Sequence, residues 1–307
     1  MDALSDLLSS VRFQATSYGL LNCRSPWGIR IPFTAGHVRL FVVMRGGCFI
    51  QFGGASQPLS LGAGEVVLSH AGTACEVKDA PGSMTVPIED IVIGERLAQI
   101  GGQGPLSSML IGCFTLKAQR NNPFLSGLPS VIHLKSENLE AAPGLEATIK
   151  LLIAELSNRN LGGDLVVNRL SDTLFVQIVR TYILQILRCP VTPVWLKGLA
   201  DPQIGRALNL IHENPAAPWT VATLATAVSM SRTAFANKFA ALVNYTPIDY
   251  LNTWRMQKAI ALLETGEDNL ALVGKKVGYS SRSAFAKAFK KEFGQSPGEY
   301  KHTVVTR

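Results

Sequence analysis

Two stretches of this 307-residue chain, fifty positions apart, carry nearly the same twenty residues. SRTAFANKFAALVNYTPIDY begins at Ser231, SRSAFAKAFKKEFGQSPGEY begins at Ser281, and eight of the twenty positions are identical. A fixed internal period is typical of a supersecondary unit that is used more than once. The sequence therefore predicts two similar small units, rather than one continuous core, in the C-terminal third of the chain.

Each copy has the residue pattern of a helix-turn-helix. In the first copy, a short amphipathic segment (220–228) is followed by the turn Ser-Met-Ser and by a second helical segment (232–243). Apolar residues recur at i, i+4 and i+7 on this second segment, which predicts a buried face made of Phe235, Phe239 and Leu242. The opposite face is small or polar and comprises Thr233, Asn237 and Ala240.

The second copy repeats this arrangement with a more basic outer face. Its predicted buried face comprises Phe285, Phe289 and Phe293, and its outer face comprises Ser283, Lys287 and Lys290. From Leu270 onward, eight lysines and arginines stand against two acidic residues, whereas a face that only confers solubility typically carries both signs of charge. A small or cationic face fits the major groove of DNA, and the basic end of the chain favours a polyanionic partner.

The segment between the copies, residues 247–264, has a helical pattern of 18 residues. Such a helix is about 27 Å long. Together with the bodies of the flanking units, it would place the two second helices about 34 Å apart, one duplex turn, on one face of DNA. Two units on a stiff rod can read two consecutive major-groove segments. The alternative is that both copies are plain helical packing modules.

The stretches SRTAFANKFAALVNYTPIDYLNTWRMQKAIALL and VGYSSRSAFAKAFKKEFGQSPGEYK resemble the paired motifs of the AraC/XylS family of bacterial transcription regulators. The resemblance covers about the last 105 positions, and it implies that the second helix of each unit contacts bases while flanking cations hold phosphates. The implied base-contacting residues are Thr233, Ala236, Asn237, Ser283, Ala286 and Lys287. The implied phosphate contacts are Arg232, Lys238, Arg282 and Lys290.

Two positions depart from the pattern of this family. Gly274 stands where the family usually has alanine, and a glycine inside a helix costs about 0.5 to 1 kcal/mol, so the second unit is predicted to be the looser one. Asn244 takes the usual glycine place at the end of the first reading helix, which is benign because asparagine tolerates the left-handed conformation.

The front of the chain has a different character. Residues 27–133 contain short apolar runs between glycine-rich turns, which predicts a compact β-sandwich or barrel. The segments MDALSDLL, WGIRIP, LGAGEVVL and NPFLSGLPSVIHL are similar to the cupin-type sensor domain of an AraC subgroup that resembles the reactive-chlorine-sensing regulators. Two helical patterns follow, at 145–156 and 162–188. Their wide apolar surfaces need a cover, which is either the β domain or the same helices of a second subunit.

The predicted fold class is therefore α+β multidomain. It comprises a cupin-like β-barrel sensor domain (1–140), a helical connector and dimerisation segment (141–200) and an all-α domain with two helix-turn-helix units (201–307). Asp201 and Pro202 have the residue types of an N-cap and a first helical position, which predicts a helix start at the last boundary.

Histidines decide whether the front domain is expected to hold a metal. Cupin enzymes bind metal through two closely spaced His, a Glu and a later His. Here only His37, His70 and His133 are available, and Arg39 stands where the partner of His37 in an HxH pair would be. His70 and His133 fit polar or capping roles. No metal or other cofactor is predicted, and a cupin-type metal-dependent enzyme remains as the competing class of function.

The input signal stays open between a metabolite and oxidation. The mouth of a β-barrel is a natural small-molecule pocket. The five cysteines are widely spaced without a CxxC pair, at Cys23, Cys48, Cys75, Cys113 and Cys189. Cys23 and Cys113 occupy places that resemble those of the redox-sensing cysteines in the subgroup. Arg24 would favour the thiolate of Cys23, whereas Cys113 lies in an apolar strand and fits a small buried hydrophobe.

Together, these features predict a sequence-specific DNA-binding transcription regulator, an activator by family habit, that responds to a small-molecule or oxidative signal. The predicted partners are double-stranded promoter DNA, RNA polymerase, a small-molecule effector and a second copy of the chain in a homodimer. Polar residues interrupt the longest apolar helical stretch (165–187), which predicts no membrane span, and no export signal is visible. The expected location is the bacterial cytoplasm, in association with the nucleoid.

Overall fold

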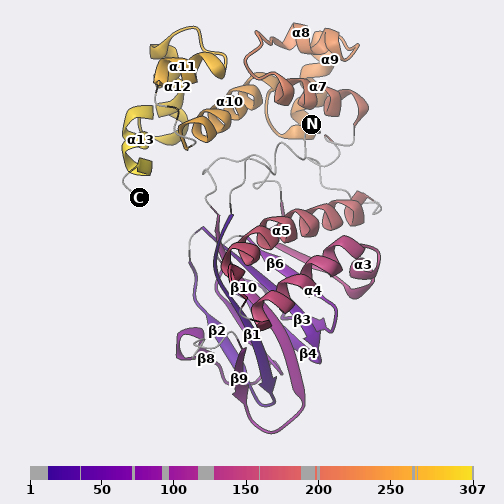
Figure 1. Cartoon of the computed structure of the whole chain (residues 1–307). Helices are drawn as coiled ribbons and strands as arrows, with labels where there is room; N and C mark the ends of the chain where they lie inside the picture. The colour runs from indigo at the N-terminus through magenta and orange to yellow at the C-terminus, as the bar shows by residue number, and fades with distance from the viewer. Residues whose placement is uncertain are drawn as a thin grey trace. The chain divides into compact units, whose positions relative to one another are not determined.

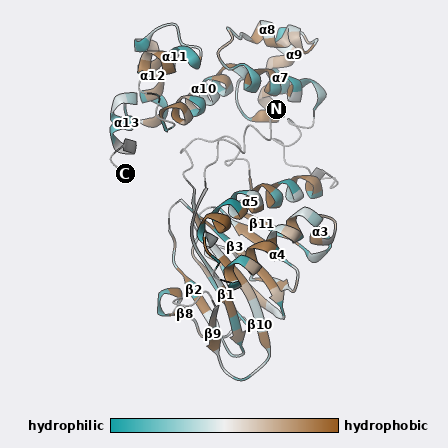
Figure 2. Cartoon of the chain, viewed as in Figure 1, coloured by the Kyte–Doolittle hydropathy of each residue, from teal (hydrophilic) through white to brown (hydrophobic). Residues whose placement is uncertain are grey.

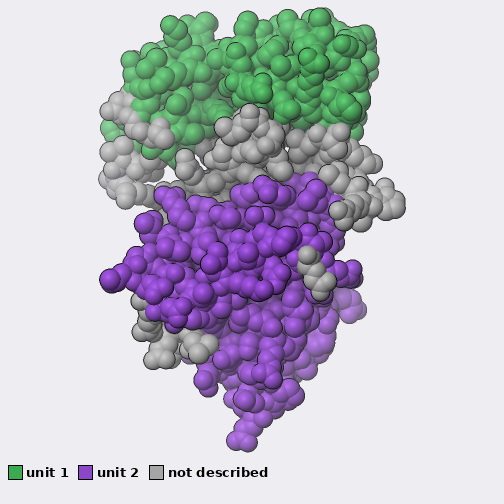
Figure 3. All heavy atoms as spheres, turned by 45° about the vertical axis from the view of Figure 1, so that its right-hand side comes forward, with its two compact units in different colours: residues 1–11, 118–127, 189–307 green, residues 12–117, 128–188 purple. Residues whose placement is uncertain are grey.

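A computed structural model of the chain describes residues 13–34, 36–70, 73–91, 97–116, 128–158, 160–187, 198, 201–264, 267 and 269–305. The contacts divide the chain into two compact units, which Figure 3 colours separately. The β unit contains the described residues from 13 to 187, and the helical unit contains those from 198 to 305. Each unit is described by itself below. The N-terminal segment MDALSDLL and Cys189 lie outside the described residues.

The β unit is built from two sheets (Figure 1). The first has the strand order β11-β6-β3-β10-β1-β9 and the second has the order β5-β4-β7-β2-β8, with most neighbours antiparallel. The strands are β1 (Phe13–Arg24), β2 (Gly28–Ile31), β3 (His37–Arg45), β4 (Gly47–Phe52), β5 (Leu59–Gly62), β6 (Val66–Ser69), β7 (Cys75–Lys78), β8 (Val86–Pro87), β9 (Leu97–Gly101), β10 (Leu106–Leu116) and β11 (Val131–Leu134). The predicted β-rich domain is confirmed. Within the described residues, it forms two sheets rather than one closed barrel.

The core of the β unit lies between the two sheets. In β4 the burial alternates along the strand, so that Cys48, Ile50 and Phe52 face the core while the residues between them are half-buried. Residues 38–43 of β3 are buried without alternation. A strand that is covered on both faces reads as a continuous apolar run, which explains the apolar residues 40–43, while Arg39 is a buried charged residue in the same strand. Figure 2 colours the chain by hydropathy, and brown, hydrophobic segments occur along the labelled strands of the β unit.

Helices cover the outer face of the first sheet. They are α3 (Ser136–Glu140), α4 (Pro143–Asn158) and α5 (Gly163–Leu187), and both α4 and α5 contact β1. The hydroxyl of Tyr18 on β1 donates a buried hydrogen bond of 2.8 Å to Oγ of Ser171 on α5. Of the two predicted covers for these helices, the β domain of the same chain is therefore the one that the structure shows.

The helical unit contains seven helices among its described residues (Figure 1). They are α7 (Pro202–Glu213), α8 (Val221–Ala227), α9 (Arg232–Val243), α10 (Pro247–Glu264), α11 (Leu270–Lys276), α12 (Arg282–Phe293) and α13 (Pro297–Val305). Helices α8 and α9 form the first helix-turn-helix, α11 and α12 form the second, and α10 connects them. The 18-residue extent of α10 matches the predicted rod.

Side chains at the helix ends explain where the reading helices begin and stop. The hydroxyls of Ser231 and Ser281 accept hydrogen bonds from backbone amides three residues further on, at 3.3 and 3.1 Å. An N-cap of this kind satisfies one of the unpaired amides of the first turn. Asn244 ends α9 with a φ of 61°, and Gly294 ends α12 with a φ of 76°. The prediction that Asn244 tolerates the left-handed conformation is confirmed.

Gly274 allows close packing inside the second unit. A β-carbon placed on Gly274 would lie 3.1 Å from both Cβ and Cγ of Phe285, which is fully buried on α12. The missing side chain therefore lets α11 approach α12 closely. This contact offsets part of the free energy that a glycine costs inside a helix.

Asp201 is the N-cap of α7, as predicted, and it also forms an ion pair. Its Oδ1 accepts from the amides of Gln203 and Ile204, and its Oδ2 lies 2.7 Å from Nζ of Lys238 on α9. Burial opposes ionisation of Asp201, but the Ile204 amide and Lys238 together hold the pKa of the carboxyl below its usual range. We expect Asp201→Ala to lower the free energy of unfolding by about 1–2 kcal/mol, measured by urea titration.

The pH dependence tests the origin of this stabilisation. A carboxyl whose folded pKa is lowered contributes stability above its ordinary pKa of about 3.9 and loses it as the pH falls through the folded value. The difference between wild type and Asp201→Ala is therefore expected to shrink below about pH 4. A difference that stays constant down to pH 2.5 would contradict the role of the charge. Asp201→Asn, which can still cap the helix, serves as the control.

Candidate DNA-binding interface

Helices α9 and α12 have the same pattern of exposure. From Ser231 and from Ser281, the first four residues are exposed, the fifth and ninth are buried, and the seventh is exposed. The buried residues are Phe235 and Phe239 in the first helix and Phe285 and Phe289 in the second. Two helices that bury the same positions present the same positions to solvent. The sequence repeat is therefore also a repeat of surfaces.

Most residues that were predicted to contact DNA lie on these outer faces. The exposed ones are Arg232, Thr233, Asn237, Arg282, Ser283, Lys287 and Lys290. Ala236 and Ala286 are half-buried beside them. The Oγ atoms of Ser283 and of the N-cap Ser281 are 3.1 Å apart, so the hydroxyl of Ser283 has a neighbour within its own chain.

Lys238 differs from the other predicted cations. Its Nζ donates to Oε1 of Gln203 at 3.1 Å, in addition to its ion pair with Asp201. The side chain thus joins α9 to the start of α7 and is half-buried. In the second copy the corresponding residue is Ala288, so this link belongs to the first unit alone.

Aromatic clusters hold each reading helix on its unit. In the second unit, Phe289 packs on Phe285, Phe293 and Tyr300 with ring centroids 4.6 to 5.7 Å apart. In the first unit, His212 stacks on Trp254 with centroids 3.9 Å apart, and its Nε2 lies 2.8 Å from the hydroxyl of Tyr250. The phenylalanines follow from the sequence pattern. His212 is a core residue that the pattern does not reveal, because its partners lie about forty residues further along the chain.

Arg255 on α10 links the two helix-turn-helix units. Its Nε donates to the carbonyl of Pro215 at 2.7 Å and its Nη2 to that of Ala217 at 2.9 Å, both in the loop between α7 and α8. The guanidinium also lies 5.8 Å from the ring centroid of Tyr279, in the turn before α12. Arg255 therefore contacts a loop of the first unit and the turn of the second. We call this contact the brace.

Gly278 completes the brace. Its φ is +91°, and a β-carbon there would lie 2.8 Å from Cα of Ala216 and 2.9 Å from Nη2 of Arg255. A glycine is required both by the left-handed backbone and by the close approach of the loop. Sequence reasoning missed both residues. The available signal was an arginine within the mostly buried helix between the repeats.

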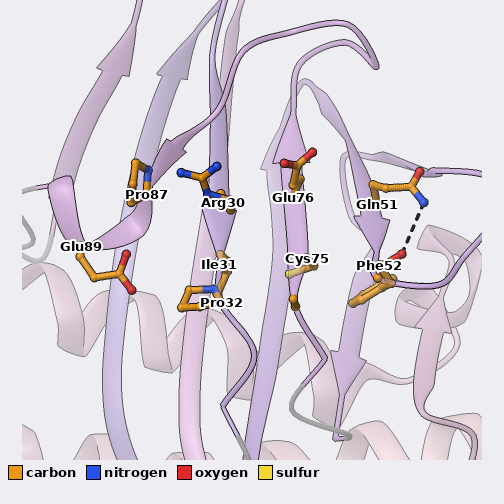
Figure 4. A pocket seen from close by; sticks show the side chains of 11 residues that line it. Arg30, Ile31, Pro32, Gln51, Phe52, Cys75, Glu76, Pro87 and Glu89 are labelled. Carbon is orange, nitrogen blue, oxygen red and sulfur yellow. Dashed lines mark hydrogen bonds between the residues drawn. The ribbon is translucent and has the colours of Figure 1, made fainter.

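The β unit has a cavity of about 390 Å³ at the ends of β2, β4 and β7 (Figure 4). Its polar lining residues are Arg30, Gln51, Glu76 and Glu89, and its apolar lining includes Ile31 and Phe52. In Figure 4 the polar side chains of Arg30, Gln51 and Glu76 lie at one level of the sheet, above Ile31 and Phe52. This wall carries one cation and two carboxylates, so both signs of charge face the cavity.

The two cysteines that were predicted to sense oxidation lie in different surroundings. Cys23 is fully buried, and burial raises the pKa of its thiol to about 12, with the nearby Cys48 acting in the same direction. Arg24 is exposed and donates to the carbonyl of Gly104 instead of contacting the Cys23 thiol. Cys113 is half-buried, and its Sγ lies 3.1 Å from Nδ1 of His37. Burial raises the pKa of Cys113, while Arg39 acts in the opposite direction.

The other two histidines of the β unit have separate partners. His70 Nε2 lies 2.8 Å from the carbonyl of Pro129, and His133 Nε2 lies 2.9 Å from Oε2 of Glu65. Across the described parts of the chain, no three His, Cys, Asp or Glu side chains are grouped in a way that would hold a metal ion. Within the same residues, every helix is too short or too polar to span a lipid bilayer.

Comparison with known proteins agrees with the division of the chain into the β unit and the helical unit. Residues 2–184 match the Cupin family model and residues 224–303 match a helix-turn-helix domain model. The chain is 31% identical to an AraC-like transcription regulator of Streptomyces lividans, over 99% of this chain and all of that protein. It is 31% identical to the HTH-type transcriptional regulator AlkR of Acinetobacter baylyi, over 98% of this chain and 99% of AlkR.

A third relative is the RCS-specific HTH-type transcriptional activator RclR of Escherichia coli. It is 32% identical over 64% of this chain and 69% of its own length. The two relatives that match the chain over nearly its whole length are named as transcription regulators and not as cupin enzymes. The chain belongs to the AraC family of transcription regulators.

Proposed function

We propose that the helical unit binds double-stranded promoter DNA by placing α9 and α12 in two consecutive major-groove segments. The observation that carries this proposal is the identical exposure pattern of the two helices, with a basic outer face on α12. In a helix-turn-helix, the exposed residues near the start of the second helix contact base edges.

The exposed residues divide into two roles by their chemistry. Thr233, Asn237, Ser283 and Lys287 are proposed to read bases, since they carry short polar groups or a cation on the outer face. Arg232, Arg282 and Lys290 are proposed to hold phosphates and to fix the register of the protein on the duplex. Lys238 is proposed to support α9 through Asp201, and it would reach phosphate only by giving up that ion pair.

The experiment that tests this function is nuclease protection of promoter fragments from the source genome. We expect two protected segments about 10 base pairs apart on one face of the duplex. Protection of one segment only, or none with folded protein, would contradict the two-unit reading. The neighbouring genes would indicate the regulated process.

We assign the input to residues 1–140 and propose that residues 141–200 form the connector and the homodimer surface. Exposed apolar side chains on α4 and α5, such as Leu151, Leu165 and Leu184, support a dimer surface. Activation through contact with RNA polymerase, in the bacterial cytoplasm and on the nucleoid, completes the proposal and rests on the family. A small-molecule effector is the first candidate input, because the β unit contains cavities.

Oxidation is the second candidate input, and the contact between Cys113 and His37 favours it. Hydrogen peroxide would transfer an oxygen atom to the Cys113 thiolate, giving a sulfenic acid and, after protonation, water. We expect a Cys113→Ser variant to lose its response to peroxide in a promoter-reporter assay, and Cys23→Ser to keep it, because Cys23 is fully buried. The opposite result would place the sensor at Cys23. Normal responses in both variants would remove the oxidative input.

A further inference from the structure

The reading helices α9 and α12 share a pattern of exposure but differ in the chemistry of their outer faces. Counted from the N-cap serine, the third, sixth and seventh residues lie on one face of each helix. We call them the reading positions. They are Thr233, Ala236 and Asn237 in α9, and Ser283, Ala286 and Lys287 in α12. The alanines are common to both helices, so the difference lies at the third and seventh positions.

The seventh position of each helix is available to a base. Asn237 and Lys287 are both exposed, and within the described parts of the chain neither side chain has a hydrogen bond or an ion pair. Lys238, the next residue of α9, differs because Asp201 and Gln203 hold its ammonium group. The amide of Asn237 and the ammonium of Lys287 therefore keep their full hydrogen-bonding capacity for DNA.

These two side chains match different bases. An asparagine amide both donates and accepts, so it can bond the N7 acceptor and the N6 amine of adenine together. A lysine ammonium only donates, so it matches the N7 and O6 acceptors of guanine, whereas the N6 amine of adenine is itself a donor. The reading positions contain no Asp or Glu, which would accept from N4 of cytosine. The seventh position therefore favours an A·T pair under α9 and a G·C pair under α12.

The third position adds to this difference. Thr233 carries a methyl group besides its hydroxyl, whereas Ser283 carries a hydroxyl alone, with Oγ of Ser281 3.1 Å away. Thymine has a methyl group in the major groove, and a threonine methyl is suited to contact it. The helix rises about 6 Å from the third to the seventh position, which is the length of about two base pairs. Thr233 and Asn237 can therefore meet neighbouring pairs, and both favour A·T.

We propose that the two helices read DNA segments of different composition. Helix α9 reads an A·T segment, in which Asn237 bonds an adenine and the Thr233 methyl contacts a thymine. Helix α12 reads a segment with a guanine at Lys287. This inference rests on the proposed function, from which it takes the placement of α9 and α12 in consecutive major-groove segments, and it deepens that function by naming the bases. The phosphate contacts do not enter it, because they carry no sequence information.

The first test is selection of DNA by the full chain from a library of random duplexes, followed by sequencing. Wild type is expected to select two segments about 10 base pairs apart, one with the A·T core and one with the guanine. Asn237→Lys, which gives the first copy the residue of the second, is expected to change adenine to guanine at one position of one segment only. Lys287→Asn is expected to make the reverse change in the other segment. The segment that changes identifies the helix that reads it.

A second test changes single atoms of the selected duplex, so it covers the case in which a variant fails to fold. Replacing the adenine by 7-deazaadenine, or the guanine by 7-deazaguanine, removes the N7 acceptor. Each change is expected to lower wild-type affinity at least fivefold by fluorescence anisotropy. Deoxyuridine in place of thymine in the A·T segment removes the methyl group and is expected to lower affinity at least threefold. Asn237→Ala is expected to respond less than twofold to 7-deazaadenine and fully to 7-deazaguanine.

Failure of this inference and failure of the proposed function give different results. Two selected segments whose bases stay the same in Asn237→Lys and Lys287→Asn would overturn the base assignment and leave the two-unit function standing. A guanine in the segment that Asn237→Lys identifies as that of α9, or full wild-type affinity for both 7-deaza duplexes, would do the same. One selected segment, or none, with folded protein would contradict the two-unit function and the base assignment together.

Discussion

An Arg255→Met variant is expected to bind a promoter fragment that contains both protected segments about 100-fold more weakly than wild type. On a fragment with one segment, its affinity is expected to change less than threefold. Two linked binding units gain affinity over one only when their geometry lets both engage at once, and that gain is typically 10² to 10⁴. The brace around Arg255 links a loop of the first unit to the turn of the second, and we expect it to fix this geometry.

The physical reason is that methionine keeps the bulk of the side chain but removes its donors. The carbonyls of Pro215 and Ala217 would lose the guanidinium that now bonds both of them, and Tyr279 would lose the cation above its ring. Each helix-turn-helix keeps its own aromatic core, so each reading helix stays formed. The expected loss therefore concerns the relation between the two units.

The measurement is a titration of both fragments by fluorescence anisotropy at one salt concentration. Lys258→Met on the same helix is the control for loss of one positive charge. Arg255→Lys keeps the charge but replaces a planar fork by a point donor, and an intermediate affinity is expected. An equal loss of affinity for the one-segment and two-segment fragments would refute the role of the brace in holding the two units. It would point to unfolding or to the loss of one positive charge. Circular dichroism of each variant separates those two explanations.

The helical unit was predictable because its signals are local. The recurrence of Phe235 with Phe239, and of Phe285 with Phe289, sets the buried face of each reading helix within a few residues of sequence. Ser231 and Ser281 mark the helix starts through hydrogen bonds to residues only three positions further along the chain. Local periodicity and capping therefore suffice for the two reading helices.

The contacts that were missed join residues far apart in the chain. Arg255 reaches carbonyls about forty residues away, and Tyr18 bonds to Ser171 across 153 positions. The sequence shows Arg39 only as a departure from a metal-binding pattern, whereas its position beside Cys113 of β10 and its bonds to Pro32 and Thr34 become visible only when the strands are in place. Periodicity carries no information about such pairs, since it describes one element at a time.

The affinity of the wild-type chain for its promoter is expected to fall steeply with salt. If four to eight phosphates are neutralised, the slope of log K against log salt lies between about −4 and −7. Raising the salt from 50 to 200 mM would then weaken binding by about 10² to 10⁴. This is the largest effect that we expect, and it is measured by the same anisotropy titration over a series of potassium chloride concentrations. A slope shallower than −2 would contradict an interface built on backbone contacts.

Two exposed cations on α12 allow the proposed phosphate contacts to be distinguished from the proposed base contacts. Arg282 stands at the first position of the helix, where a phosphate contact is proposed, and Lys287 stands on the outer face that is proposed to meet bases. Arg282→Ala is expected to lower the affinity for promoter DNA and for unrelated DNA to the same extent. It is also expected to make the slope of log K against log salt shallower by about one unit. Lys287→Ala is expected to lower the affinity for promoter DNA by about 10-fold and that for unrelated DNA much less. A base contact favours the correct base over a wrong one by about 1–3 kcal/mol. Lys258→Ala on α10 should leave the ratio of the two affinities unchanged. If all three variants lose affinity equally on both DNAs, total charge rather than the placement of α12 determines binding.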